Sequence, residues 1–124
     1  MALRQQCSMS IGVRVRLHAV NAALQGDIDR LCALWEEGLS RFGGPFLAGK
    51  AFTAADAFFA PVVFRVRSYG LELTPEASAY ADRLHGLEGM RLWEREALAE
   101  TLREPGHDRE IAARGAVLED RRAV

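Results

Sequence analysis

The sequence is poor in the features that define several classes of protein. It has only two cysteines, Cys7 and Cys32, which are too few for a disulfide scaffold and are not spaced as a metal-binding pair. It contains no stretch of 18 or more apolar residues, so an ordinary membrane-spanning helix is excluded. The first residues also lack the apolar run of a secretory signal. We therefore expect a protein of a reducing compartment, the cytoplasm, with no membrane partner.

An excess of charge of either sign is missing as well. With 16 basic and 17 acidic residues the formal net charge is −1, which provides no field to gather nucleic acid, and we predict no such partner. Lysine is nearly absent, because Lys50 is the only one and every other basic residue is arginine. We attribute this bias to a GC-rich genome. Arg14 and Arg16 would point to the same side of an extended backbone and could grip an anion, but surface solubility explains them more simply.

Local clusters of metal ligands or catalytic groups are also absent. The three histidines, His18, His85 and His107, lie far apart, and none is three or four residues from another histidine or a cysteine, as zinc ligands commonly are. Cys7 has no neighbouring base, and Cys32 adjoins an apolar stripe, as is typical of a buried free cysteine. We predict no catalytic residue, no metal site and no cofactor in this chain.

Helical periodicity is the main feature that the sequence does contain. The 124 residues, 49% hydrophobic and 27% charged, are enough for one domain with a packed core. The clearest helix runs from near Asn21 to about Phe42, and Gly43-Gly44-Pro45 ends it. Apolar residues recur along it at steps of three and four: Leu24, Ile28, Leu31, Trp35, Leu39 and Phe42.

A second helix is predicted from Ala54 to Tyr69. Thr53 can cap it, and Asp56, three residues on, can reach back to the amide of Thr53 and complete a capping box. We expect the loss of either side chain to cost about 1 kcal/mol, and more if the box is buried. The helix is apolar nearly all round, so we predict that it lies buried at the centre of the domain.

The remaining segments are read from weaker signals. Thr74 and Pro75 are typical of a helix start, and a break at Gly86 to Gly89 leads into a fourth helix that carries Trp93. Residues 13–17 alternate as a strand would, but we find no partner for them and predict extended backbone packed on the helices. Beyond residue 106 we expect a polar tail with a short helix around 108–117 and a frayed end.

Two motifs and the helix after them resemble a known family. The loop at 43–49 (GGPFLAG), the segment at 52–57 (FTAADA) and the apolar helix that follows resemble the C-terminal helical domain of cytosolic glutathione S-transferases. That family has a G-x-F-L-x-G loop followed by a capping box of the form S/T-x-x-D. The resemblance implies an all-α helical bundle over residues 1–106, with Thr53 and Asp56 as determinants of folding, and a polar tail over 107–124.

The resemblance covers only one half of such a transferase. Members of the family begin with a thioredoxin-like domain of about eighty residues, which binds glutathione and activates its thiol, and this sequence has no such half. Its first helix is expected to be truncated too. The chain would then supply the wall of the hydrophobic co-substrate pocket, with Met9 and Phe59 as candidate pocket residues, and would be inactive alone. Glutathione is the co-substrate that the family implies.

Two other interpretations stay open. The chain could be a non-catalytic helical module for protein–protein interaction, of the kind that this domain resembles in translation factors and synthetases, or a degraded pseudoenzyme that merely folds. The absence of the other half is expected to leave apolar surface exposed, and we therefore predict self-association or a partner that covers this surface.

Overall fold

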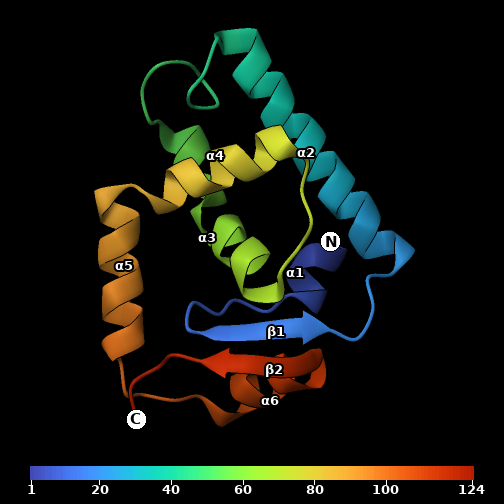
Figure 1. The fold of residues 1–124 in the computed structure, drawn as a ribbon, viewed down its shortest axis with the longest axis vertical. Helices are drawn as coiled ribbons and strands as arrows, with labels where there is room; N and C mark the ends of the chain where they lie inside the picture. The colour runs from blue at the N-terminus through green and yellow to red at the C-terminus, as the bar shows by residue number, and fades with distance from the viewer.

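Residues 1–124 fold into six helices and two short strands (Figure 1). The computed structural model describes every residue of the chain. In chain order the elements are α1 (Ala2–Gln6), β1 (Val13–Leu17), α2 (Ala22–Phe42), α3 (Ala54–Tyr69), α4 (Pro75–His85), α5 (Glu88–Ala99), α6 (Pro105–Ala113) and β2 (Gly115–Asp120). The predicted helical fold class is confirmed, with a small two-stranded sheet in addition.

The long helix α2 begins and ends where the sequence indicates. The side chain of Asn21 caps it by accepting a hydrogen bond from the amide of Leu24 at 2.9 Å. Gly43 ends it with φ 82°, in the left-handed region that favours glycine. The predicted stripe is buried from Leu24 to Trp35, whereas Phe42 at its end is 54% exposed.

The helix α3 departs from the prediction that it is buried all round. Its second half is buried at Val63, Phe64, Ser68 and Tyr69. In its first half only Asp56 is buried, and Phe58 is 81% exposed. The expectation of a central, fully buried helix is therefore wrong for the first two turns, where Ala54, Ala55, Ala57 and Phe58 are exposed because no other element of the chain covers them.

The core is centred on Trp35, which has no exposed surface. Its indole meets the ring of Tyr80 at 4.9 Å and that of Phe59 at 5.6 Å between centroids, both edge to face. Aromatic pairs prefer this arrangement because the positive ring edge meets the negative ring face. Helices α2, α3 and α4 are thus joined through three aromatic side chains.

The two strands correct the sequence analysis at both ends of the chain. β1 pairs with β2 in antiparallel fashion, from Val13 opposite Asp120 to Leu17 opposite Gly115 (Figure 1). The prediction that residues 13–17 have no partner is therefore wrong. The helix expected around 108–117 is α6, which ends at Ala113, and the residues after it form β2 rather than a frayed end. Five of the six residues of β2 are exposed, so its sequence shows no alternation that could identify a strand.

Candidate functional site

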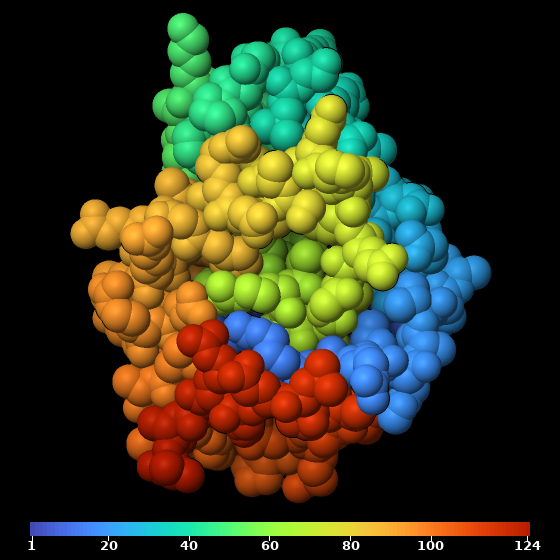
Figure 2. All heavy atoms as spheres, in the orientation of Figure 1, coloured from blue at the N-terminus to red at the C-terminus, as the bar shows by residue number.

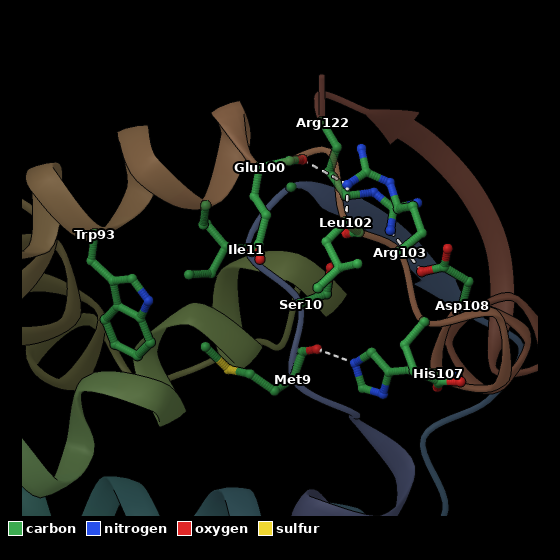
Figure 3. A pocket seen from close by; sticks show the side chains of 13 residues that line it. Met9, Ser10, Ile11, Trp93, Glu100, Leu102, Arg103, His107, Asp108 and Arg122 are labelled. Atoms are coloured by element: carbon green, nitrogen blue, oxygen red, sulfur yellow. Dashed lines mark hydrogen bonds and ion pairs between the residues drawn. The ribbon is translucent and has the colours of Figure 1, made fainter. Parts of the chain in front are cut away.

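A hollow of about 630 Å³ lies where the loop before β1, the helix α5 and the start of α6 meet (Figure 3). This volume is within the range of ligand pockets, roughly 300–1,000 Å³. Thirteen residues line it: Met9, Ser10, Ile11, Gly12, Trp93, Ala97, Glu100, Leu102, Arg103, Glu104, His107, Asp108 and Arg122.

One side of the hollow is apolar. Met9 and Ile11 come from the loop, Trp93 and Ala97 from consecutive turns of α5, and Leu102 from the segment after it. Trp93 is held at 5.0 Å from Phe64, edge to face, and is 39% exposed. The indole is therefore fixed from behind by the core while part of its surface stays available to a ligand.

The opposite side carries charged and polar groups (Figure 3). A ring nitrogen of His107, Nε2, lies 2.6 Å from the carbonyl oxygen of Met9. Arg122 donates to Asp108 at 2.6 Å and, through Nε and Nη2, to both carboxylate oxygens of Asp120 at 2.9 and 2.7 Å. The bidentate pair raises the pKa of Arg122 and lowers that of Asp120.

These polar groups make hydrogen bonds that hold the ends of the chain together. Arg103 donates hydrogen bonds to the backbone carbonyls of Glu100 and Leu102. The hydroxyl of Ser10 accepts from the amide of Val13 at 3.3 Å and makes no bond to His107. A nucleophile next to a base is what covalent catalysis requires, and Ser10 and His107 make no such hydrogen bond to each other.

Comparison with protein families decides the kind of domain. The family model of the glutathione S-transferase C-terminal domain matches residues 19–96, more than half of the chain. The chain belongs to this family. Comparisons with curated proteins and with solved structures give no match.

The family match and the hollow overlap only in part. The matched segment of the glutathione S-transferase domain contains Trp93 and most of α5, whereas Met9, His107 and Arg122 lie outside it. The residues that close the hollow therefore come from the two ends of the chain, which the β1–β2 pairing brings together.

The structure separates the two predicted pocket residues. Met9 lines the hollow. Phe59 does not; it packs edge-on against Trp35 and belongs to the partly buried residues around the core. Sequence reasoning missed Trp93, which it placed on a fourth helix without a role in a pocket, and His107 and Arg122, which it placed in a polar tail.

Thr53 and Asp56 lie at the start of α3, away from the hollow. Asp56 is fully buried and accepts hydrogen bonds from the amides of Thr53 at 2.9 Å and Leu47 at 3.0 Å, and from the hydroxyl of Tyr80 at 2.7 Å. Burial alone would raise the pKa of Asp56, but these hydrogen bonds outweigh it and hold the pKa below its usual value. The carboxylate thus joins the loop before α3 to the helix α4.

The two cysteines belong to the buried core. Both are free and buried, and burial raises the pKa of Cys7 to about 11, so its thiol stays protonated at neutral pH. No three His, Cys, Asp or Glu side chains lie close enough together to hold a metal ion. None of the helices combines the length and the apolar composition needed to cross a membrane.

Proposed function

We propose that this domain supplies the wall of the hydrophobic co-substrate pocket of a glutathione transferase, with the hollow between Met9 and Trp93 as that wall. The observation that carries the proposal is the half-exposed indole of Trp93 facing a hollow of about 630 Å³. An aromatic electrophile can stack on this ring and bury its apolar face there.

The chemical step would take place on groups outside these 124 residues. In conjugation the negative charge is carried by the sulfur of glutathione and passes to the electrophile, so a catalytic group must stabilise the thiolate. Ser10 carries the one hydroxyl among the residues that line the hollow, and this residue is buried, with 9% of its surface exposed. The domain alone would therefore bind the electrophile without accelerating its conjugation, and glutathione would bind to a thioredoxin-like domain.

An exposed apolar surface at the start of α3 supports the same proposal. The first two turns of α3 expose Ala54, Ala55, Ala57 and Phe58, with Phe58 81% exposed. An apolar face of this kind on a helix end promotes association. In the proposed transferase it is covered by another domain or by a second copy of the chain. In the alternative function, a helical interaction module, the same face docks an unrelated protein. With two free cysteines, either role suits the cytoplasm.

An assay of conjugation separates these roles. The purified chain is mixed with glutathione and 1-chloro-2,4-dinitrobenzene, and the product is followed by absorbance. We expect the rate of the buffer alone, together with saturable binding of the unreactive analogue 1,3-dinitrobenzene. Turnover above the buffer rate that survives repurification would contradict the assignment of the chemistry to another domain. Absence of any binding of the analogue would favour the interaction module.

A further inference from the structure

The two arginines that border the hollow are already held by other groups of the chain. Arg122 donates through Nη1 to Asp108 at 2.6 Å and through Nε and Nη2 to Asp120 at 2.9 and 2.7 Å. Arg103 donates through Nη1 and Nη2 to three backbone carbonyl oxygens. Most of the N–H groups of both guanidinium groups are therefore turned to the chain itself, and an anionic ligand would have to compete for them.

The acidic residues of the same border differ from one another in this respect. The carboxylate of Glu104 accepts two backbone amides at the start of α6, and that of Asp108 is paired with Arg122. The carboxylate of Glu100 takes part in no hydrogen bond or ion pair, and the residue is exposed at the hollow. The charged group of the hollow that lacks a partner is therefore negative.

Glu100 lies on the same side of α5 as Trp93. The two residues are seven positions apart, which corresponds to two helical turns and a rise of about 10 Å along the axis. Ala97, which lies between them, lines the hollow as well, and its small side chain leaves room for a ligand. In Figure 3 Trp93 lies at one end of the hollow and Glu100 further along the same helix. A ligand ring on the indole can therefore direct a short side chain toward the carboxylate.

The end of α5 adds to the negative potential near Glu100. The last carbonyl groups of a helix form the negative end of its dipole and favour cations, and the last turn of α5 contains no basic residue. The amide of Ala123 binds the carbonyl of Leu98 at 2.8 Å. The C-terminal residues of the chain thus cover one side of this helix end, as Figure 2 shows in red beside the orange α5, while Glu100 stays exposed.

The indole of Trp93 favours a positive charge for a separate reason. The face of an aromatic ring is negatively polarised and attracts an ammonium group, and tryptophan does so most strongly. The border as a whole has the same sign, since its three acidic residues outnumber its two arginines. The unpaired carboxylate, the helix end and the indole therefore act in the same direction.

We propose that Glu100 gives the hollow a preference for aromatic co-substrates that carry a cationic group, such as an ammonium, two or three bonds from the ring. This inference rests on the proposed function, because it names the class of electrophile that the hollow takes. The ring lies on Trp93 and against Met9, and the cationic group lies toward the carboxylate of Glu100. Glu100 determines specificity and takes no part in bond formation.

Three ligands with the same ring test the preference by isothermal titration of the full chain. At neutral pH 2-(4-nitrophenyl)ethylamine is a cation, 2-(4-nitrophenyl)ethanol is uncharged and 4-nitrophenylacetic acid is an anion. We expect the amine to bind about fivefold more tightly than the alcohol, and the acid to bind about threefold more weakly than the alcohol. These differences should shrink at about 1 M NaCl, because salt screens exposed charges.

Variants of two glutamates on α5 separate the charge of Glu100 from its effect on the fold. Glu100→Gln should remove the advantage of the amine and leave the affinity for the alcohol unchanged. Glu88→Gln makes the same change at the other, exposed end of the helix and should leave all three affinities unchanged. Glu100→Lys should reverse the order, so that the acid binds more tightly than the amine, a gain that a damaged fold would not produce.

The outcomes distinguish this proposal from the proposed function. Equal affinities for the three ligands, or an advantage of the amine that persists in Glu100→Gln, would overturn the preference for cations and leave the pocket itself in place. No binding of any of the three ligands or of 1,3-dinitrobenzene would instead overturn the proposed pocket, and the preference with it.

Discussion

The hydroxyl of Tyr80 on α4 lies 2.7 Å from a carboxylate oxygen of Asp56 on α3, and both side chains are fully buried. The same carboxylate accepts the amides of Leu47 and Thr53. One negative charge therefore satisfies donors from a loop, a helix start and a neighbouring helix, which are separated by up to 33 residues along the chain. A buried charge is tolerated only with such complete hydrogen bonding.

The first prediction compares two tyrosines. Tyr80→Phe removes a hydrogen bond to a charged acceptor, and Tyr69→Phe removes the 2.7 Å bond from Tyr69 to the neutral carbonyl of Ser8. Bonds to charged groups stabilise more, so we expect losses of about 2 and about 1 kcal/mol in the free energy of unfolding, measured by urea denaturation. Equal losses would mean that the charge on Asp56 adds nothing to the bond.

The second prediction concerns the stability of the fold at low pH. The pKa of Asp56 is lowered in the folded chain, so its carboxylate stabilises the fold above the unfolded pKa of about 3.9 and loses this effect as the pH falls through the lower folded value. We expect the melting temperature to drop as the pH is lowered below about 4. Glu94, whose pKa is also lowered, contributes to the same drop.

Asp56→Asn is the matched variant for this acid effect. It retains the shape of the side chain but removes the charge and replaces one acceptor oxygen with a donor, which cannot accept the bonds of Asp56. We expect a loss of about 3 kcal/mol at pH 6 and a smaller drop in melting temperature between pH 5 and pH 3. The same acid sensitivity in Asp56→Asn as in the unmodified chain would assign that sensitivity to other carboxyl groups.

The third prediction concerns the strand pairing that closes the chain. A Cβ at Gly115 would lie 2.0 Å from the carbonyl oxygen of Arg16, whereas one at Gly26, within α2, would meet nothing within 4 Å. Gly115→Ala should therefore force β2 away from β1 and lower stability by about 2 kcal/mol or more. Gly26→Ala should raise it by about 0.5–1 kcal/mol, because alanine favours the helix. Thermal denaturation measures the stability of both variants. A Gly115→Ala variant as stable as the unmodified chain would mean that β1 and β2 do not pair as described.

The fourth prediction concerns the exposed face of α3. We expect the purified chain to self-associate at high micromolar concentration, as measured by light scattering, and Phe58→Ser to reduce this association. Leu102→Ser, which alters a side chain that is 79% exposed but lies outside α3, serves as the control. A chain that is monomeric over the whole concentration range would contradict association through this face.

The helices α2, α3 and α4 could be predicted from sequence because each carries its own signal. Asn21, Thr53 and Thr74 mark starts, Gly43 and Gly70 mark ends, and the spacing of apolar residues marks the buried face. These signals are local, since capping and periodicity involve residues within a few positions of one another. The resemblance to a known family at residues 43–57 predicted that these helices form a bundle.

The sheet and the hollow could not be predicted because they depend on contacts between the two ends of the chain. β2 has five exposed residues and no alternation, so nothing in it identifies a partner for β1. The hollow follows from that pairing, because it brings Arg122 and His107 beside the loop of Met9. Phe58 is exposed because no other element of the chain packs against it. The spacing of apolar residues along a helix cannot predict the absence of a neighbouring element.

The central claim, that the hollow between Met9 and Trp93 receives an aromatic electrophile, is tested most directly by tryptophan fluorescence. The chain has two tryptophans, of which Trp35 is fully buried and Trp93 is 39% exposed at the hollow. Titration with 1,3-dinitrobenzene should quench the fluorescence saturably. The saturable part should disappear in Trp93→Phe, and Met9→Ala should weaken binding about tenfold, while Leu34→Ala on α2 should not change it. Quenching that does not saturate, or that persists in Trp93→Phe, would contradict the claim.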